Sequence, residues 1–177
     1  LLQLGVLRKK RDWQEGQPGS PLPVNQSLLE TFLHSLPFTL TPAQDKALTE
    51  LLADIEQPRP MSRLLQGDVG SGKTVVAAAA LLMATVNGYQ GALMAPTEIL
   101  AEQHYFTICH LLSSAGSLDG KEERLSTFAG LLTSPLTVAL LTGDTKGAKK
   151  KALQERIASG GVDIVIGTHA LFQKEVE

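Results

Sequence analysis

The residues from Gly67 to Thr74 have the types and the spacing of a loop that wraps a polyphosphate. In this GxxxxGK(S/T) pattern, glycines let successive backbone N–H groups point inward toward phosphate oxygens. Lys73 has the length and charge to reach the β- and γ-phosphates, and Thr74 offers a hydroxyl to Mg²⁺. We therefore predict a nucleotide and Mg²⁺ site, with Lys73 and Thr74 also catalytic, made by the residues Gly67, Asp68, Val69, Gly70, Ser71, Gly72, Lys73 and Thr74.

The segments on either side of this loop predict the strand and the helix that such a loop needs. Residues 63–66 are expected to form a short buried strand, and residues 75–84 are an apolar helical run without Gly or Pro. The phosphates would then lie at a helix N-terminus, where N–H groups and the macrodipole favour anions. The alternative is a glycine-rich turn that carries Lys-Thr by chance, and the agreement of both flanks argues against it.

Composition narrows the class of protein. The chain has 177 residues, 43% of them hydrophobic, which suits one globular α/β domain. Its net charge of −2 argues against coating nucleic acid through bulk charge, so any polyanion must be held by local patches. The single cysteine, Cys109, excludes an internal disulfide and fits a reducing compartment. Because no run approaches 18 apolar residues, we expect a cytoplasmic protein without a membrane partner.

The order of the other elements predicts a parallel sheet with helices on both faces. A Pro- and Gly-containing linker over residues 14–25 precedes an amphipathic helix over 26–36 and a second helix that begins at the Thr41 N-cap. Further along, strands and helices alternate, and the strands are almost continuously apolar, as in buried parallel sheets. The expected strands are 91–95, 137–141 and 162–166, and the expected helices are 97–112 and 146–159. Residues 113–136 are expected to be a surface insertion, a Ser/Gly loop followed by a helix within 121–132.

Small polar residues follow each predicted strand of this sheet. In open α/β sheets, ligands bind beyond the carboxyl ends of the strands. Hydroxyls and helix N-termini there can hold phosphodiester oxygens without reading bases. The alternative, ordinary helix capping, applies to each cluster taken singly. The residues predicted to contact a nucleic acid backbone are Thr97, Gly143, Thr168 and His169, with Lys146, Lys149 and Lys150 as nearby positive charge.

Taken together, these motifs resemble the first motor domain of superfamily-two helicases, and more narrowly the RecG branched-DNA helicase family. The resemblance extends over nearly the whole chain. It is carried by residues 36–44 (the adenine-reading Q motif), 60–74 (motif I), 95–104 (motif Ia), 141–143 (motif Ib) and 164–171 (the motif before motif II). The exact sequence of residues 67–74 is close to specific for this family and is shared chiefly with the transcription-repair coupling factor. A DNA translocase of that kind is therefore an alternative. A P-loop small-molecule kinase is an alternative from another class.

The resemblance implies an ATP-dependent DNA helicase with a RecA-like P-loop NTPase fold that acts on branched or forked DNA in repair and recombination. It implies that ATP and Mg²⁺ are the cofactors and that Gln44 hydrogen-bonds the adenine. Residues 1–25 would be a linker helix and loop from the side of a preceding wedge domain, with a helix ending near Arg11. Residues 26–177 would be the N-terminal part of the first motor domain.

The chain also departs from the family pattern. It begins at Leu1 instead of Met and reaches Glu177 before any strand that ends in the Asp-Glu pair of Walker B. Asp163 precedes its strand, so it cannot take that role. The wedge domain and the second motor domain, which supplies an arginine finger, would be partners from the same longer chain. We therefore expect a fragment truncated before the Walker B strand and inactive by itself.

Overall fold

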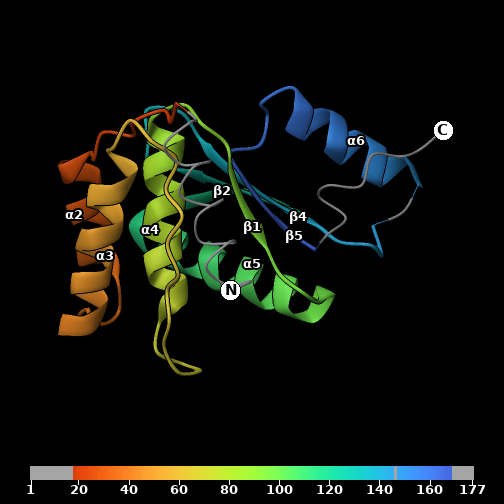
Figure 1. The fold of residues 1–177 in the computed structure, drawn as a ribbon. Helices are drawn as coiled ribbons and strands as arrows, with labels where there is room; N and C mark the ends of the chain where they lie inside the picture. Colours follow the sequence, from red (N-terminus) through yellow and green to blue (C-terminus); the bar gives the residue numbers. More distant parts are fainter. Residues whose placement is uncertain (1–17, 146, 169–177) are drawn as a thin grey trace, which may run out of the picture.

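The computed structural model describes residues 18–145 and 147–168. Figure 1 shows helices packed on a twisted sheet, with α6 on the side of the sheet away from α4 and α5. The predicted linker helix that ends near Arg11, together with Lys146 and His169, lies outside the described residues.

The first two described helices begin at side-chain caps, and the sequence predicts the second of these, Thr41. In α2 (Gln26–Ser35), the Asn25 side chain accepts a hydrogen bond from the Leu28 N–H at 3.0 Å. In α3 (Pro42–Ile55), Thr41 and Gln44 form a reciprocal capping box, and Pro42 occupies the first turn. These bonds satisfy N–H groups that a helix start otherwise leaves unpaired. The helix that follows the phosphate loop is α4 (Lys73–Val86).

Three parallel strands form the part of the sheet that the sequence predicts. They are β1 (Gly91–Met94), β4 (Leu136–Leu141) and β5 (Ile164–Gly167), and β5 lies between the other two. Gly167 pairs with both Met94 and Leu141, so the carboxyl ends of the strands are level. The crossovers are α5 (Glu98–Ala115) between β1 and the rest of the sheet, and α6 (Gly147–Ala158) between β4 and β5.

Alternate residues of the central strands enter two different cores. Val138 and Leu140 of β4 belong to the larger apolar cluster, which also contains residues of α2, α3, α4 and α5. Ala139 and Leu141 belong to a smaller cluster with Leu153 of α6. Since side chains alternate across a strand, both faces are covered by helices, as predicted.

The interpretation of residues 113–136 was wrong, because they extend the sheet instead of forming a loop and a helix. β2 (Ser117–Glu122) and β3 (Leu125–Ala129) make an antiparallel hairpin, and β3 pairs antiparallel with β4. The sheet is therefore mixed, in the order β1-β5-β4-β3-β2. In β3, Ser126 and Phe128 are buried while their neighbours are half-buried, which is the period of a strand. Pairing with the edge of β4, which the apolar spacing within residues 121–132 does not reveal, selects the strand.

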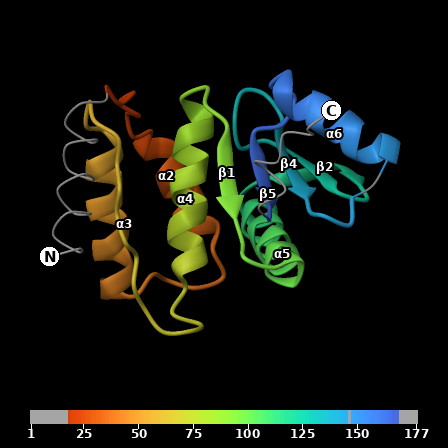
Figure 2. The ribbon, with the colours of Figure 1, turned by 45° about the vertical axis from the view of Figure 1, so that its right-hand side comes forward.

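The strand expected at residues 63–66 is also absent from the described structure, where this segment has no regular secondary structure. The Arg63 guanidinium donates to Asp54 at 2.6 Å and to Glu50 at 2.7 Å, both on α3. Leu64 is 84% exposed. Figure 2 shows the connection from α3 to α4 running outside the sheet. Its charged contacts with α3 hold the segment there.

Candidate functional site

The loop that precedes α4 has the backbone of a phosphate-binding loop. Gly70 and Gly72 have φ values of +82° and +78°, a left-handed conformation that favours glycine. Gly72 is the N-cap of α4 and has no side chain to bond the first N–H groups of that helix. A Cβ at Gly72 would overlap the amide nitrogen of Gln44. The loop therefore keeps an uncapped helix start open, which is the arrangement that suits an anion.

Lys73 is curled over the loop from the first turn of α4. Its ammonium donates to the carbonyl oxygens of Gly67 and Asp68, each at 2.7 Å, and to the Ser71 hydroxyl at 3.3 Å. The charge that the motif predicts is thus inside the loop, within reach of its backbone. Thr74 is half-buried in the same turn.

Gln44 joins α3 to this loop. Its amide oxygen accepts from the Thr41 N–H at 2.8 Å, and its amide nitrogen donates to the Ser71 carbonyl at 2.8 Å. The residue predicted to bond the adenine therefore lies beside the residues predicted to bond the phosphates, although the two segments are 27 residues apart in sequence.

A cavity of about 360 Å³ lies between α3 and the loop. Its size is within the range of small-molecule sites. Six of the predicted residues line the cavity: Gln44, Gly67, Gly70, Ser71, Gly72 and Lys73. The hydrogen-bond donors of these residues suit a nucleoside polyphosphate. Asp68, Val69 and Thr74 are not part of that lining, and Val69 is fully exposed.

The three described residues that were predicted to contact a nucleic acid backbone lie at one edge of the sheet. Thr97 follows β1 and caps α5 through a bond from the Leu100 N–H at 3.3 Å. Gly143 follows β4, and the buried Thr168 follows β5. Since the ends of these strands are level, the three segments are neighbours, and their contact with nucleic acid stays a prediction. Figure 2 shows that the loop before α4 lies toward the same end of the sheet as the arrowhead of β1, which marks the carboxyl end of that strand.

The loop after β4 is tied to the helix after β1. Glu98, in the first turn of α5, accepts from the Asp144 N–H at 3.1 Å. Within the loop, the Thr145 hydroxyl accepts from the Thr142 N–H at 3.4 Å. Arg124 in the hairpin turn also contacts this loop. Sequence reasoning missed Arg124 because it placed a helix there.

One acid that bears on the predicted chemistry, Asp163, is held by a backbone contact. Asp163 accepts from the Thr137 N–H at 2.7 Å, which confirms that it holds the starts of two strands and does not follow a strand as a Walker B acid would. No cluster of three or more His, Cys, Asp or Glu side chains able to hold a metal occurs among residues 18–145 and 147–168. In the same ranges, no helix is long and apolar enough to span a membrane.

Comparisons with known proteins agree with this geometry. The ATP-dependent DNA helicase RecG of Bacillus subtilis is 47% identical over 177 residues, covering 100% of this chain and 23% of that protein. RecG of Synechocystis sp. is 43% identical over 175 residues, covering 99% of this chain and 19% of that protein. A solved structure of RecG bound to a three-way DNA junction matches with a TM-score of 0.76 and 41% identity, over 96% of this chain and 21% of that one.

The chain thus spans about a fifth of the length of the curated relatives it matches. A model of the DEAD/DEAH box helicases matches residues 41–177. Since that match begins at the N-cap of α3, includes the whole phosphate loop and continues past β5, the chain belongs to the DEAD/DEAH box helicase family.

Proposed function

We propose that this chain is the ATP-binding part of the first motor domain of an ATP-dependent DNA helicase that acts on branched DNA, at replication forks and recombination intermediates. The observation that carries the proposal is the phosphate loop with Lys73 inside it and Gln44 beside it. The similarity to RecG helicases, one of them bound to a three-way DNA junction, supports branched DNA as the substrate.

In the proposed mechanism, nucleotide binding exchanges contacts within the loop for contacts with phosphate. The Lys73 ammonium leaves the Gly67 and Asp68 carbonyls and neutralises the β- and γ-phosphates. The N–H groups at the start of α4 donate to phosphate oxygens, and Thr74 offers its hydroxyl to Mg²⁺. When bound, Mg²⁺ neutralises charge on the phosphate oxygens.

Gln44 adds selectivity for adenine in this proposal. A carboxamide has a donor end and an acceptor end, which match the N6 and N7 groups of adenine. Each end of the amide has capacity for a second hydrogen bond, so Gln44 can bond adenine while it keeps the Thr41 N–H and the Ser71 carbonyl as partners. Because Ser71 belongs to the phosphate loop, Gln44 would then connect the base to that loop.

The larger organisation is part of the same proposal. Residues 1–25 connect to a wedge domain, and residues 26–177 form the first part of a motor domain whose second half completes the ATP cleft. The chain covers only 19–23% of the two RecG relatives, which supports a longer full-length protein but does not test the boundary at residue 25. DNA would lie across the edge formed by Thr97, Gly143, Thr168 and His169, and the protein would work in the cytoplasm.

The test is calorimetric titration of Mg²⁺–ATP into the unmodified protein and the Lys73→Ala variant. Removing a charge-assisted hydrogen-bond donor is expected to weaken binding by about tenfold to a hundredfold. Lys149→Ala is the matched control, because Lys149 is an exposed lysine on α6, and it should leave the affinity unchanged. Equal affinities of the unmodified and Lys73→Ala proteins would show that the loop is not the site.

A further inference from the structure

We propose that Arg124, in the turn of the β2–β3 hairpin, is a positioning residue that fixes the loop of residues 142–145 for contact with a nucleic acid backbone. The inference rests on the proposed function, because that function places DNA across this edge. It also assigns a role to the hairpin, whose sequence carries no chemistry of its own.

Arg124 bridges the two side chains that shape the loop. One guanidinium nitrogen donates to the Thr142 hydroxyl at 2.9 Å, and another donates to the Asp144 carboxylate at 2.7 Å. The Thr142 hydroxyl also donates to the other oxygen of Asp144, which closes the triangle. A planar guanidinium presents several donors in a rigid fork, whereas a lysine ammonium is a single point charge. Arg124 therefore holds its two partners with two separate nitrogens of one rigid plane, a geometry that the single nitrogen of a lysine does not reproduce.

The contacts with Thr142 and Arg124 favour the ionised form of Asp144. The bond from Thr142, followed by the contact with Arg124, holds the pKa of Asp144 below its ordinary value. The Asp144 carboxylate is thus ionised at neutral pH and attracts the guanidinium. The Arg124 side chain is only 20% exposed, so water screens this pair less than a fully exposed one.

The same loop is anchored from the nucleic-acid side of the sheet. Glu98 of α5 accepts from the Asp144 N–H, so Asp144 is held by its backbone on one side and by its carboxylate on the other. Gly143 lies between the two anchors and is exposed. Fixing Thr142 and Asp144 therefore fixes the Gly143 peptide, whose polar groups are those predicted to face a phosphodiester.

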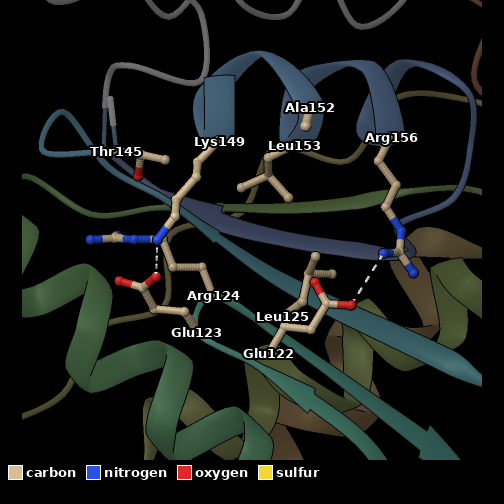
Figure 3. Close-up of a pocket in the computed structure, with 9 residues that line it drawn as sticks. All are labelled: Glu122, Glu123, Arg124, Leu125, Thr145, Lys149, Ala152, Leu153 and Arg156. Carbon is tan, nitrogen blue, oxygen red and sulfur yellow. Dashed lines mark hydrogen bonds and ion pairs between the residues drawn. The ribbon is translucent and has the colours of Figure 1, made fainter. Parts of the chain in front are cut away.

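The hairpin has independent supports that do not involve the Arg124 side chain. Figure 3 shows Lys149 and Arg156 of α6 directed toward Glu123 and Glu122 of the hairpin. The ammonium of Lys149 is 2.5 Å from the Glu123 carboxylate, and the guanidinium of Arg156 is 3.8 Å from the Glu122 carboxylate. The Leu140 N–H also donates to the Arg124 carbonyl at 2.9 Å, which fixes the backbone of the turn. Removing the guanidinium is therefore expected to free the loop and leave the hairpin in place. Arg156 provides a matched arginine that contacts the hairpin and not the loop.

The experiment compares Arg124→Gln, Arg124→Lys and the control Arg156→Gln by three measurements. Amide hydrogen exchange at Asp144 should be about tenfold faster in Arg124→Gln, because the loop opens more often. The affinity for a fluorescein-labelled oligo(dT) should fall about three- to tenfold, whereas the affinity for Mg²⁺–ATP should change less than about twofold. Arg124→Lys should restore only part of both effects, and Arg156→Gln should show neither. Asp144→Asn, which alters the loop side of the contact, should reproduce Arg124→Gln.

The outcomes separate this inference from the proposed function. If the unmodified protein binds oligo(dT) and Arg124→Gln changes neither exchange nor affinity, the inference is wrong. Faster exchange with unchanged DNA affinity also overturns it, because the loop would then lie outside the DNA path. If the unmodified protein does not bind oligo(dT), the proposed DNA surface fails, and hydrogen exchange alone decides whether Arg124 braces the loop.

Discussion

Single residues of the nucleotide site already have partners within the protein. The Lys73 ammonium has three acceptors in its own loop, and both ends of the Gln44 amide are bonded. Binding a nucleotide therefore replaces one hydrogen bond with another, which contributes little net free energy per bond. The gain must come from opposite charges, since a phosphate is a stronger partner for an ammonium than a carbonyl is. This is why Lys73 is the residue whose removal should affect binding most.

Another residue-scale contact concerns stability. The hydroxyls of Tyr105 and Ser126 are 2.8 Å apart, and both residues are buried between α5 and β3. Tyr105→Phe leaves the Ser126 hydroxyl without this partner, so the free energy of unfolding should fall by about 1 kcal/mol. Urea unfolding of both proteins near neutral pH measures the difference. The variant Ser126→Ala provides the control. Tyr105→Phe should lower the free energy of unfolding less in the Ser126→Ala background than in the unmodified protein, because the hydrogen bond is already absent there.

The same tyrosine predicts an alkaline limit to stability. Burial raises the pKa of Tyr105 to about 12, above its ordinary value of 10.0. A raised pKa means that this contribution is complete below the ordinary pKa and is lost as the pH rises toward the folded-state value. Urea unfolding at about pH 11 should therefore show a loss in the unmodified protein that Tyr105→Phe reduces. An equal loss in both proteins would contradict this assignment.

At the scale of elements, the sequence predicts what is coded locally. The capped start of α3 and the strands β1, β4 and β5 were predicted to within about two residues, because capping and apolar runs are local signals. The β2–β3 hairpin was not predicted, since the apolar residues at 125, 128, 129 and 132 also fit one face of a helix. Leu125 and Phe128 pair with Ala139 and Leu136 of β4, which lie outside the segment that was interpreted as a helix. The segment at 63–66 fails as a strand for a related reason, because its Arg63 is bonded to α3.

The lysines of α6 give an element-scale test of the DNA path. Lys149 forms an exposed ion pair with Glu123, of a kind that contributes little to stability, so it can be reversed without unfolding the helix. Lys149→Glu combined with Lys150→Glu should weaken oligonucleotide binding and make its salt dependence less steep by roughly 0.7 for each phosphate that the variant no longer neutralises. Fluorescence anisotropy over a salt series measures both quantities.

The control for these lysines is Lys46→Glu on α3, another exposed lysine that pairs with a glutamate. It should leave the affinity and the salt slope close to those of the unmodified protein. Unchanged values in the α6 variant as well would remove α6 from the DNA path, and its lysines would then be a solvated surface.

At the scale of the whole molecule, the fold brings the two predicted ligand sites to the same end of the sheet, where the parallel strands end. The phosphate loop was predicted because all of its residues are consecutive in sequence, and the strand-end clusters were predicted from the rule for open α/β sheets. The contacts that join these segments were not predicted. Gln44 to Ser71, Glu98 to Asp144 and Arg124 to Thr142 each join residues at least 18 positions apart.

The last prediction concerns catalysis by the 177-residue chain prepared by itself. We expect it to bind ATP and to release no phosphate above the buffer blank, with or without forked DNA. Phosphoryl transfer depends on acids that hold Mg²⁺ and position water, and on an arginine that stabilises the transition state. Three acids that could substitute are already engaged: Asp163 with the Thr137 N–H, Glu98 with the Asp144 N–H, and Asp144 with Arg124.

A phosphate-release assay on the unmodified chain and on Lys73→Ala measures this directly, with a RecG helicase as the positive control. Equal signals from both proteins, at the level of the blank, are the expected result. Turnover that Lys73→Ala abolishes would contradict it. Since Asp68 lies in the loop and Glu98 lies at the start of α5, Asp68→Asn and Glu98→Gln would then identify the acid that holds the metal.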